Sequence, residues 1–146
     1  MITGIVLLVP ETYCITPHAH ITLLAPFGRG QQPTTGELDE VEAYFAGIAP
    51  FAYSLTDVCT FPDGTRYLAP DPAAKFSRMT QALHRAFPEY PPYEGKYDLV
   101  VPHLTVEDDA VVPPLPVGAY ATEATLLHYD GKFSSLATFP FGTSAA

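Results

Sequence analysis

Two short segments of the sequence share a pattern of residues that could carry out acid–base chemistry. Each holds His, an apolar residue, Thr and a second apolar residue, at 20–23 ("HITL") and at 103–106 ("HLTV"). An imidazole has an ordinary pKa of about 6.5, so it can accept or donate a proton near neutral pH. A Thr hydroxyl can donate a hydrogen bond to an oxygen on which charge develops. Together the two segments could supply an acid, a base and two hydrogen-bond donors to one reacting centre.

Both segments are typical of β-strands, and a strand would position their polar side chains. Alternate side chains of a strand point to opposite faces, so His20 and Thr22 share one face while the apolar residue between them takes the other. The same holds for His103 and Thr105. The two copies lie more than half the chain apart. A duplicated lobe folded about a pseudo-twofold axis would bring the two strands together, with both histidines facing one cleft.

The rest of the sequence indicates further strands and two amphipathic helices. Thr34 and Glu37 form a capping-box pattern at the start of the first helix. In the second helix, Asp71 is the expected N-cap and Pro72 the first helical residue. We expect strands over residues 4–10, 51–62, 65–70 and 99–108, helices within 34–50 and 71–88, and a hairpin over 123–142 that turns at Asp130–Gly131. This order favours an α+β fold with largely antiparallel sheets, built as one domain over residues 1–146.

The composition limits the classes of partner. Seven Lys and Arg against sixteen Asp and Glu give a formal net charge of −9, the wrong sign for gripping long nucleic acid through its phosphates. No apolar run approaches the roughly 20 residues that a membrane span needs, and the N-terminus lacks the basic residues of a signal peptide. We therefore expect a cytoplasmic, monomeric protein that does not bind membranes. Cys14 and Cys59 are too few for a disulfide framework and are interpreted as buried thiols.

The pair of motifs resembles that of the 2H phosphoesterase superfamily, which includes the bacterial 2′-5′ RNA ligase-like proteins and RNA 2′,3′-cyclic phosphodiesterases. That family is defined by two copies of His, apolar, Thr or Ser, apolar. The resemblance runs through "HITLLAPF", "FPDGTRYLAPDP", "FPEYPPYEGKYDLVVPHLTV" and "LATFPFG". It implies a bilobed fold, each lobe a small antiparallel sheet backed by helix, with the active site in the groove between the lobes.

The resemblance also implies phosphodiester chemistry without a metal or other cofactor. His20 and His103 are then the acid–base pair, and Thr22 and Thr105 are the hydrogen-bond donors to the phosphate. We expect the substrate to be a small nucleotide or a short RNA terminus that carries a 2′,3′-cyclic phosphate or a related phosphodiester. Reverse 2′-5′ ligation is chemically permitted.

Three other interpretations stay open. The histidine-triad nucleotide hydrolases have a third His where this chain has Thr22, and they leave "HLTV" unexplained. Cys14, His18, His20 and His103 could hold a metal ion. A non-catalytic nucleotide-binding module could keep the same fold and groove.

Residues near the two motifs could contact a substrate. A nucleobase could stack on Phe27, Tyr67, Tyr97 or Phe133. Arg66 and Lys96 are the nearest cations that could steer a phosphate. His18 is expected to be peripheral to the site.

Overall fold

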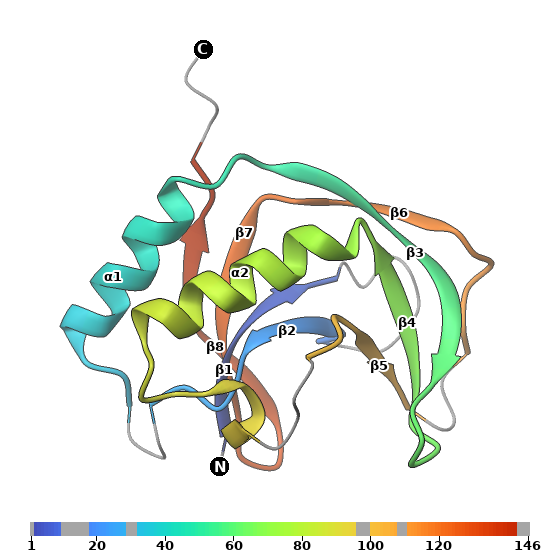
Figure 1. Ribbon diagram of the computed structural model, residues 1–146, viewed down its shortest axis with the longest axis horizontal. Helices are drawn as coiled ribbons and strands as arrows, with labels where there is room; N and C mark the ends of the chain where they lie inside the picture. The colour runs from blue at the N-terminus through green and yellow to red at the C-terminus, as the bar shows by residue number, and fades with distance from the viewer. Residues whose placement is uncertain (1, 10–17, 29–31, 96–99, 108–110, 143–146) are drawn as a thin grey trace.

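The computed structural model describes residues 2–9, 18–28, 32–95, 100–107 and 111–142. Within these ranges the elements are eight strands, two α-helices and one 3-10 helix, arranged as Figure 1 shows. The strands are β1 (Ile2–Leu8), β2 (His20–Leu24), β3 (Phe51–Thr60), β4 (Arg66–Asp71), β5 (Leu104–Val106), β6 (Val117–Ala121), β7 (Glu123–Tyr129) and β8 (Phe133–Pro140). The helices are α1 (Thr35–Ala46), α2 (Ala73–Ala86) and η2 (Pro92–Gly95).

The eight described strands form one sheet, in the order β6-β3-β4-β5-β2-β1-β7-β8. Each pairing between them is antiparallel. The order divides into two groups of four, one ending at β5 and the other beginning at β2, which lie side by side at the centre (Figure 1). The α+β fold with an antiparallel sheet, predicted from the sequence, is confirmed.

Helix α1 begins where the sequence predicts. The Thr34 hydroxyl accepts a hydrogen bond from the Glu37 amide at 3.1 Å, and the Glu37 carboxylate accepts one from the Thr34 amide at 2.9 Å. These two bonds satisfy backbone donors that a helix start leaves without partners. The helix buries Val41 and Phe45 and packs on β8.

Helix α2 begins one residue later than predicted. Asp71 is the last residue of β4, and Pro72 is the N-cap, with no side-chain cap. Because Asp71 continues the pairing of β4 with β3 opposite Ser54, its backbone belongs to the sheet, and this overrides its tendency to cap a helix. The predicted N-cap at Asp71 is therefore wrong, although the helix itself is correctly placed.

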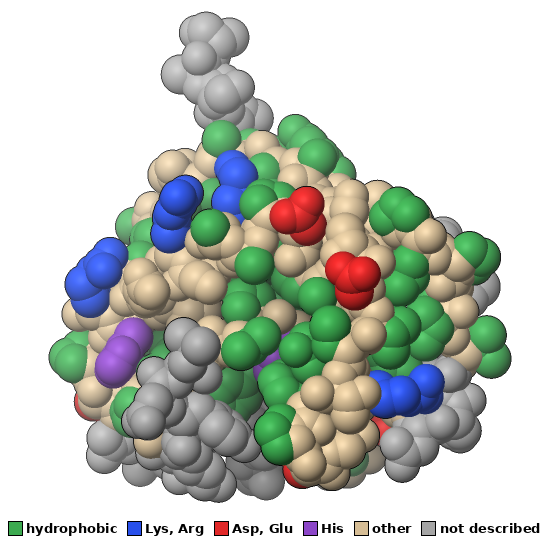
Figure 2. Space-filling view, turned by 45° about the vertical axis from the view of Figure 1, so that its right-hand side comes forward, with side chains coloured by type: hydrophobic (Ala, Val, Ile, Leu, Met, Phe, Trp, Pro, Cys, Tyr) green, Lys and Arg blue, Asp and Glu red, His purple; other side chains and the backbone are tan. Residues whose placement is uncertain are grey.

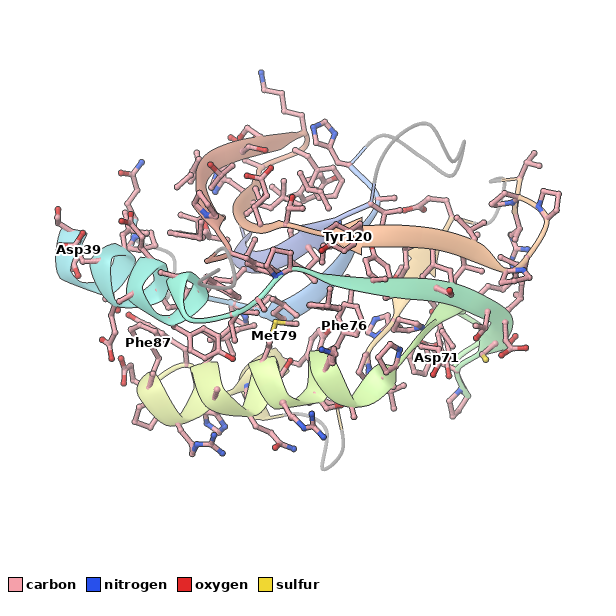
Figure 3. The ribbon with its side chains drawn as sticks, turned by 90° about the horizontal axis from the view of Figure 1, so that it is seen from above. Asp39, Asp71, Phe76, Met79, Phe87 and Tyr120 are labelled. Atoms are coloured by element: carbon pink, nitrogen blue, oxygen red, sulfur yellow. The ribbon has the colours of Figure 1, made fainter. Side chains whose placement is uncertain are left out.

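Side chains of α2 hold the sheet in place beside the first motif. Phe76, Met79 and Phe87 point from the helix toward the sheet in Figure 3. The hydroxyl of buried Thr80 donates a hydrogen bond of 2.7 Å to the carbonyl oxygen of Leu23 in β2. Burying each large apolar side chain contributes about 1.5–3 kcal/mol. Helix α2 thus fixes the strand that carries the first His and Thr.

The sheet has two chemically different faces. One carries most of the core, including Ile21, Leu104 and the residues on which α1 and α2 pack. The opposite face, called here the histidine face, carries the His and Thr side chains of both motifs. Cys59 is half-buried, which corrects the prediction of a buried thiol, since its position pairs with Tyr67 on the histidine face. Cys14 lies outside the described residues.

Apolar and charged side chains both occur on the side of the molecule that Figure 2 brings forward. Hydrophobic side chains cover much of this side, with acidic side chains near the centre of the view and a Lys or Arg at its right, while further Lys and Arg side chains lie at the upper left. In the part of the chain that the structure describes, no helix has the length and apolar character that a membrane crossing would need.

Candidate active site

The two motifs lie on neighbouring antiparallel strands. Ile21 of β2 pairs with Leu104 of β5, and both side chains are fully buried on the core side. A register centred on this pair relates the strands by a local twofold axis, which exchanges residue 20 with 103 and residue 22 with 105. His20 and His103 are then diagonal neighbours, a relation that places side chains roughly 7–8 Å apart in an antiparallel pair. The structure therefore brings the four polar motif residues together on one face.

Both histidines are held by the same backbone contact. The Nδ1 of His20 lies 2.8 Å from the carbonyl oxygen of His18, and the Nδ1 of His103 lies 2.6 Å from the carbonyl oxygen of Val101. A carbonyl oxygen can only accept, so Nδ1 must be the donor in each ring. The neutral form of each imidazole then carries its free lone pair on Nε2. Each ring offers one nitrogen for proton transfer, and its other nitrogen fixes the orientation of the ring.

His18 makes its contact from an unusual backbone conformation. Its φ is 61°, in the left-handed region that few residues other than Gly adopt readily. This conformation lies directly before β2 and places the His18 carbonyl two residues back along the chain from the ring it orients. The expectation that His18 is peripheral is therefore wrong for its backbone, because its carbonyl is a direct partner of His20. No sequence pattern could have indicated this role, since any residue can supply a carbonyl.

The surroundings of His20 favour its neutral form. Burial lowers the pKa of His20 below its ordinary value of 6.5, and the nearby charges of His103 and His18 lower it further, while the hydrogen bond to the His18 backbone raises it. The ring of Phe133, in β8, packs against it with centroids 5.7 Å apart. His20 is thus suited to accept a proton near neutral pH.

His103 lies among aromatic rings. Phe61, at the turn between β3 and β4, has its ring centroid 5.0 Å from that of His103. Tyr67 and Tyr93 lie at 5.8 Å and 6.3 Å. Phe61 and Tyr67 also stack on each other at 4.1 Å. These rings form an aromatic cluster around the second histidine.

The predicted substrate contacts have mixed outcomes. Tyr67 lies on the histidine face, paired with Thr105, as a contact near the site requires. Phe27 does not: it is 1% exposed and packs edge-to-face on Phe87 and Tyr90, so this prediction is corrected. Its apolar ring is buried in the core behind β2, where no nucleobase can reach it.

The predicted cations do not gather at the motifs in the described part of the chain. Arg66 pairs with Val106, whose side chain is in the core, so strand alternation directs Arg66 away from the histidine face. Its guanidinium donates to the Glu107 carbonyl at 3.1 Å. The prediction that Arg66 steers a phosphate at the motifs is thereby corrected. Tyr97 and Lys96 lie outside the described residues.

Two aromatic residues near the site were missed from the sequence. Phe61 and Tyr93 both contact His103, yet one lies at a hairpin turn and the other in a 3-10 helix. Neither has a spacing that relates it to a motif. Among the described residues, no three His, Cys, Asp or Glu side chains group closely enough to hold a metal ion.

Comparison with known proteins identifies the family. The family model described as the 2'-5' RNA ligase superfamily matches residues 14–135. The chain belongs to this superfamily, and the resemblance to 2H phosphoesterases is confirmed. Among curated proteins, none matches the sequence.

Solved structures share the fold. The protein TT0787 of Thermus thermophilus superposes with a TM-score of 0.70 at 18% identity, over 99% of this chain and 100% of that one. LigT of E. coli complexed with 3'-AMP gives 0.61 at 15% identity, over 95% of this chain and 97% of that one. LigT complexed with NADP+ gives 0.60 at 15% identity, over 97% of each chain. At these identities the likeness shows the fold alone.

Proposed function

We propose that this protein is a metal-independent phosphodiesterase that hydrolyses a 2′,3′-cyclic phosphate, or a related phosphodiester of a small nucleotide or RNA end. One observation carries the proposal: on paired strands, two histidines have their Nδ1 atoms held by backbone carbonyls, so both Nε2 atoms are left for proton transfer. Opening a cyclic phosphate by in-line attack needs a base on one side of the phosphorus and an acid on the other. The paired arrangement supplies both.

The environment of His20 indicates which of the two rings is the general base. Because burial lowers the pKa of His20, that ring is neutral near pH 7 and is assigned as the general base. His103 is assigned as the general acid, protonated at Nε2 at the start of the reaction. Roles would exchange in the reverse, ligating direction, as microscopic reversibility requires.

In the proposed step, Nε2 of His20 takes a proton from water as the water oxygen bonds to phosphorus. The bond between phosphorus and the 2′ or 3′ oxygen breaks, and that oxygen receives the proton from Nε2 of His103. The hydroxyls of Thr22 and Thr105 donate hydrogen bonds to the non-bridging oxygens, where negative charge increases. His20 ends protonated and His103 neutral, and exchange with solvent restores both.

Three further observations support a small nucleotide as substrate. The chain carries a net charge of −9, which disfavours long nucleic acid. The aromatic cluster at His103 offers faces on which a base can stack, worth about 1–3 kcal/mol per base. LigT, which shares this fold, is described in complexes with 3'-AMP, ATP and NADP+.

The test is a substrate panel measured in the presence of a chelator. It contains 2′,3′-cyclic mononucleotides, RNA ending in a cyclic phosphate, 2′-5′ oligoadenylate and cyclic dinucleotides. We expect turnover of at least one of the first three with chelator present, and the position of the product phosphate identifies the leaving oxygen. Turnover that chelator abolishes and added metal restores would instead support the metal-dependent interpretation. Nucleotide binding without turnover of any member would support a binding module.

A further inference from the structure

A pocket of about 390 Å³ lies beyond His20, at the other end of the site from the aromatic cluster. It forms where the ends of β1 and β8 approach the bend between β6 and β7. Its lining residues are Leu7, Leu8, Val9, His18, Tyr53, Tyr120, Ala121, Thr122, Glu123 and Ser135. None of them belongs to either motif.

Strand registers place several lining side chains on the histidine face. Leu8 pairs directly with His20. Glu123 lies two residues before Thr125, which pairs with Val6, itself paired with Thr22. The pocket therefore borders the face that carries the two motifs, while Leu7, Val9, Tyr53 and Ala121 of its lining belong to the core cluster.

Tyr120 and Ser135 complete this side of the pocket. Tyr120, on β6, is 62% exposed, whereas its neighbour Ala121 is buried in the core, so Tyr120 faces away from the core. In Figure 3 it lies on the far side of β3 from α2. Ser135 pairs with Leu127, which is buried outside the core cluster.

Aromatic contacts link the pocket to the first histidine. His18 lines the pocket, and its ring lies 5.7 Å from that of Phe133. Phe133 in turn lies 5.7 Å from the ring of His20. A molecule that fills the pocket and extends past Phe133 would reach the proposed base.

The chemistry of the lining selects against a phosphate and for an uncharged ring. No Lys or Arg lies among the ten lining residues, and Glu123 would repel an anion. The pocket combines an apolar floor, the ring of Tyr120, one carboxylate and the hydroxyls of Thr122 and Ser135. A carboxylate only accepts hydrogen bonds, so it would pair with N–H groups such as the amino group of a nucleobase. The volume falls within the range of small-molecule pockets.

We propose that this pocket binds a nucleoside, with the base against Tyr120 and its amino group donating to Glu123. The proposal rests on the proposed function for its biological meaning, since the nucleoside would be the part of the substrate that keeps the phosphate when the other part leaves toward His103. A substrate with a nucleoside on each side of the phosphorus would then occupy both the pocket and the aromatic cluster. The preferred substrate would be a phosphodiester that joins two nucleosides, such as a 2′-5′-linked dinucleotide, rather than a cyclic mononucleotide.

The test uses ligands that carry no phosphate, and so it is independent of catalysis. Binding of adenosine and of purine riboside, which lacks only the amino group, is measured by ligand-observed NMR and calorimetry. The proteins are the wild type, Tyr120→Ala, Glu123→Ala and the double variant His20→Ala/His103→Ala. Val58→Ala, an exposed apolar position on β3, is the matched surface control.

We expect adenosine to bind more tightly than purine riboside, and this preference to disappear in Glu123→Ala. Tyr120→Ala should weaken both ligands about fivefold or more, the loss of one stacking contact, whereas Val58→Ala should weaken neither. Binding should persist in the double histidine variant. Absence of nucleoside binding, or binding that neither pocket variant changes, would overturn the proposal. Binding as expected without turnover of any phosphodiester would leave the pocket standing and refute the proposed reaction.

Discussion

The two halves of the sheet place the same pair of side chains in different surroundings. In both halves a His donates through Nδ1 to the carbonyl two residues back, and a Thr follows two residues on. His20 is the first residue of β2, which is five residues long and pairs with β1 over four positions. His103 directly precedes β5, which has three residues and pairs with both β4 and β2, and aromatic rings from a hairpin turn and a 3-10 helix lie around its imidazole.

The two halves share the backbone contact that orients each imidazole, and they differ in the side chains around that imidazole. The backbone contact is the same in both, and it gives each ring the same tautomer. The neighbouring side chains differ, since one ring is half-buried beside Phe133 and the other lies among Phe61, Tyr67 and Tyr93. Repetition thus places two similarly oriented imidazoles on one face, and divergence gives them different neighbours.

Removal of either imidazole is the strongest test of whether both histidines are needed for turnover. His20→Ala and His103→Ala should each lower kcat by a factor of about 10²–10⁴, since each removes one proton-transfer group. Steady-state hydrolysis of the best substrate in the panel measures the effect. His84→Ala, which removes an imidazole from α2, is the control, and circular dichroism checks that all variants are folded. Wild-type turnover in either motif variant would contradict the paired mechanism.

Substitution of the threonines tests whether the two halves contribute equally to hydrogen bonding of the phosphate oxygens. Thr22→Val and Thr105→Val keep the shape of the side chain and the strand propensity but remove the hydroxyl. Each should lower kcat by about tenfold to a hundredfold, at or below the loss of one oxyanion donor, with little change in thermal stability. A larger loss for one of them would show that the phosphate lies closer to that half. No loss for both would remove the threonines from the mechanism.

The sequence predicted the placement of the repeated His and Thr residues better than the contacts that distinguish the halves. Strand alternation was enough to put His20 with Thr22 and His103 with Thr105, and the buried pair Ile21 and Leu104 confirms it. The capping box of α1 was equally local and equally reliable. Strand alternation and helix capping can be recognised in a single sequence, because both depend only on residues close together in the chain.

The contacts that sequence analysis missed depend on distant elements. Phe27 follows the first motif directly, but α2 and the segment after it bury its ring under Phe87 and Tyr90. Phe61 comes to His103 only because β4 pairs with β5. The left-handed backbone of His18 has no sequence signature, since His is only moderately favoured there. Tertiary packing decides each of these cases.

The pH profile tests whether burial distinguishes the two rings. The lowered pKa of His20 predicts that kcat/KM falls as pH drops through a value below 6.5, because protonated His20 cannot accept a proton. Phe133→Ala should admit water to His20, raise its pKa toward the ordinary value and move this acid limb to higher pH. Phe61→Ala, beside His103, should leave the acid limb in place. A shift in Phe61→Ala alone would reverse the assignment of base and acid.

The smallest expected effect concerns the backbone before each histidine. His18 has a φ of 61°, whereas its counterpart Val101 has no positive φ, so a β-branched residue is tolerated at one position and strained at the other. His18→Val should therefore cost about 1–2 kcal/mol of strain, which the chain can relieve by withdrawing the carbonyl from Nδ1 of His20. We expect kcat to fall roughly 5- to 30-fold, and nitrogen NMR of the imidazole to show a mixture of tautomers at His20. His18→Asn, which tolerates the left-handed region, should lose less, and Val101→Ile should leave the His103 tautomer unchanged. Equal losses in His18→Val and His18→Asn would mean that the ring of His18, rather than its carbonyl, acts at the site.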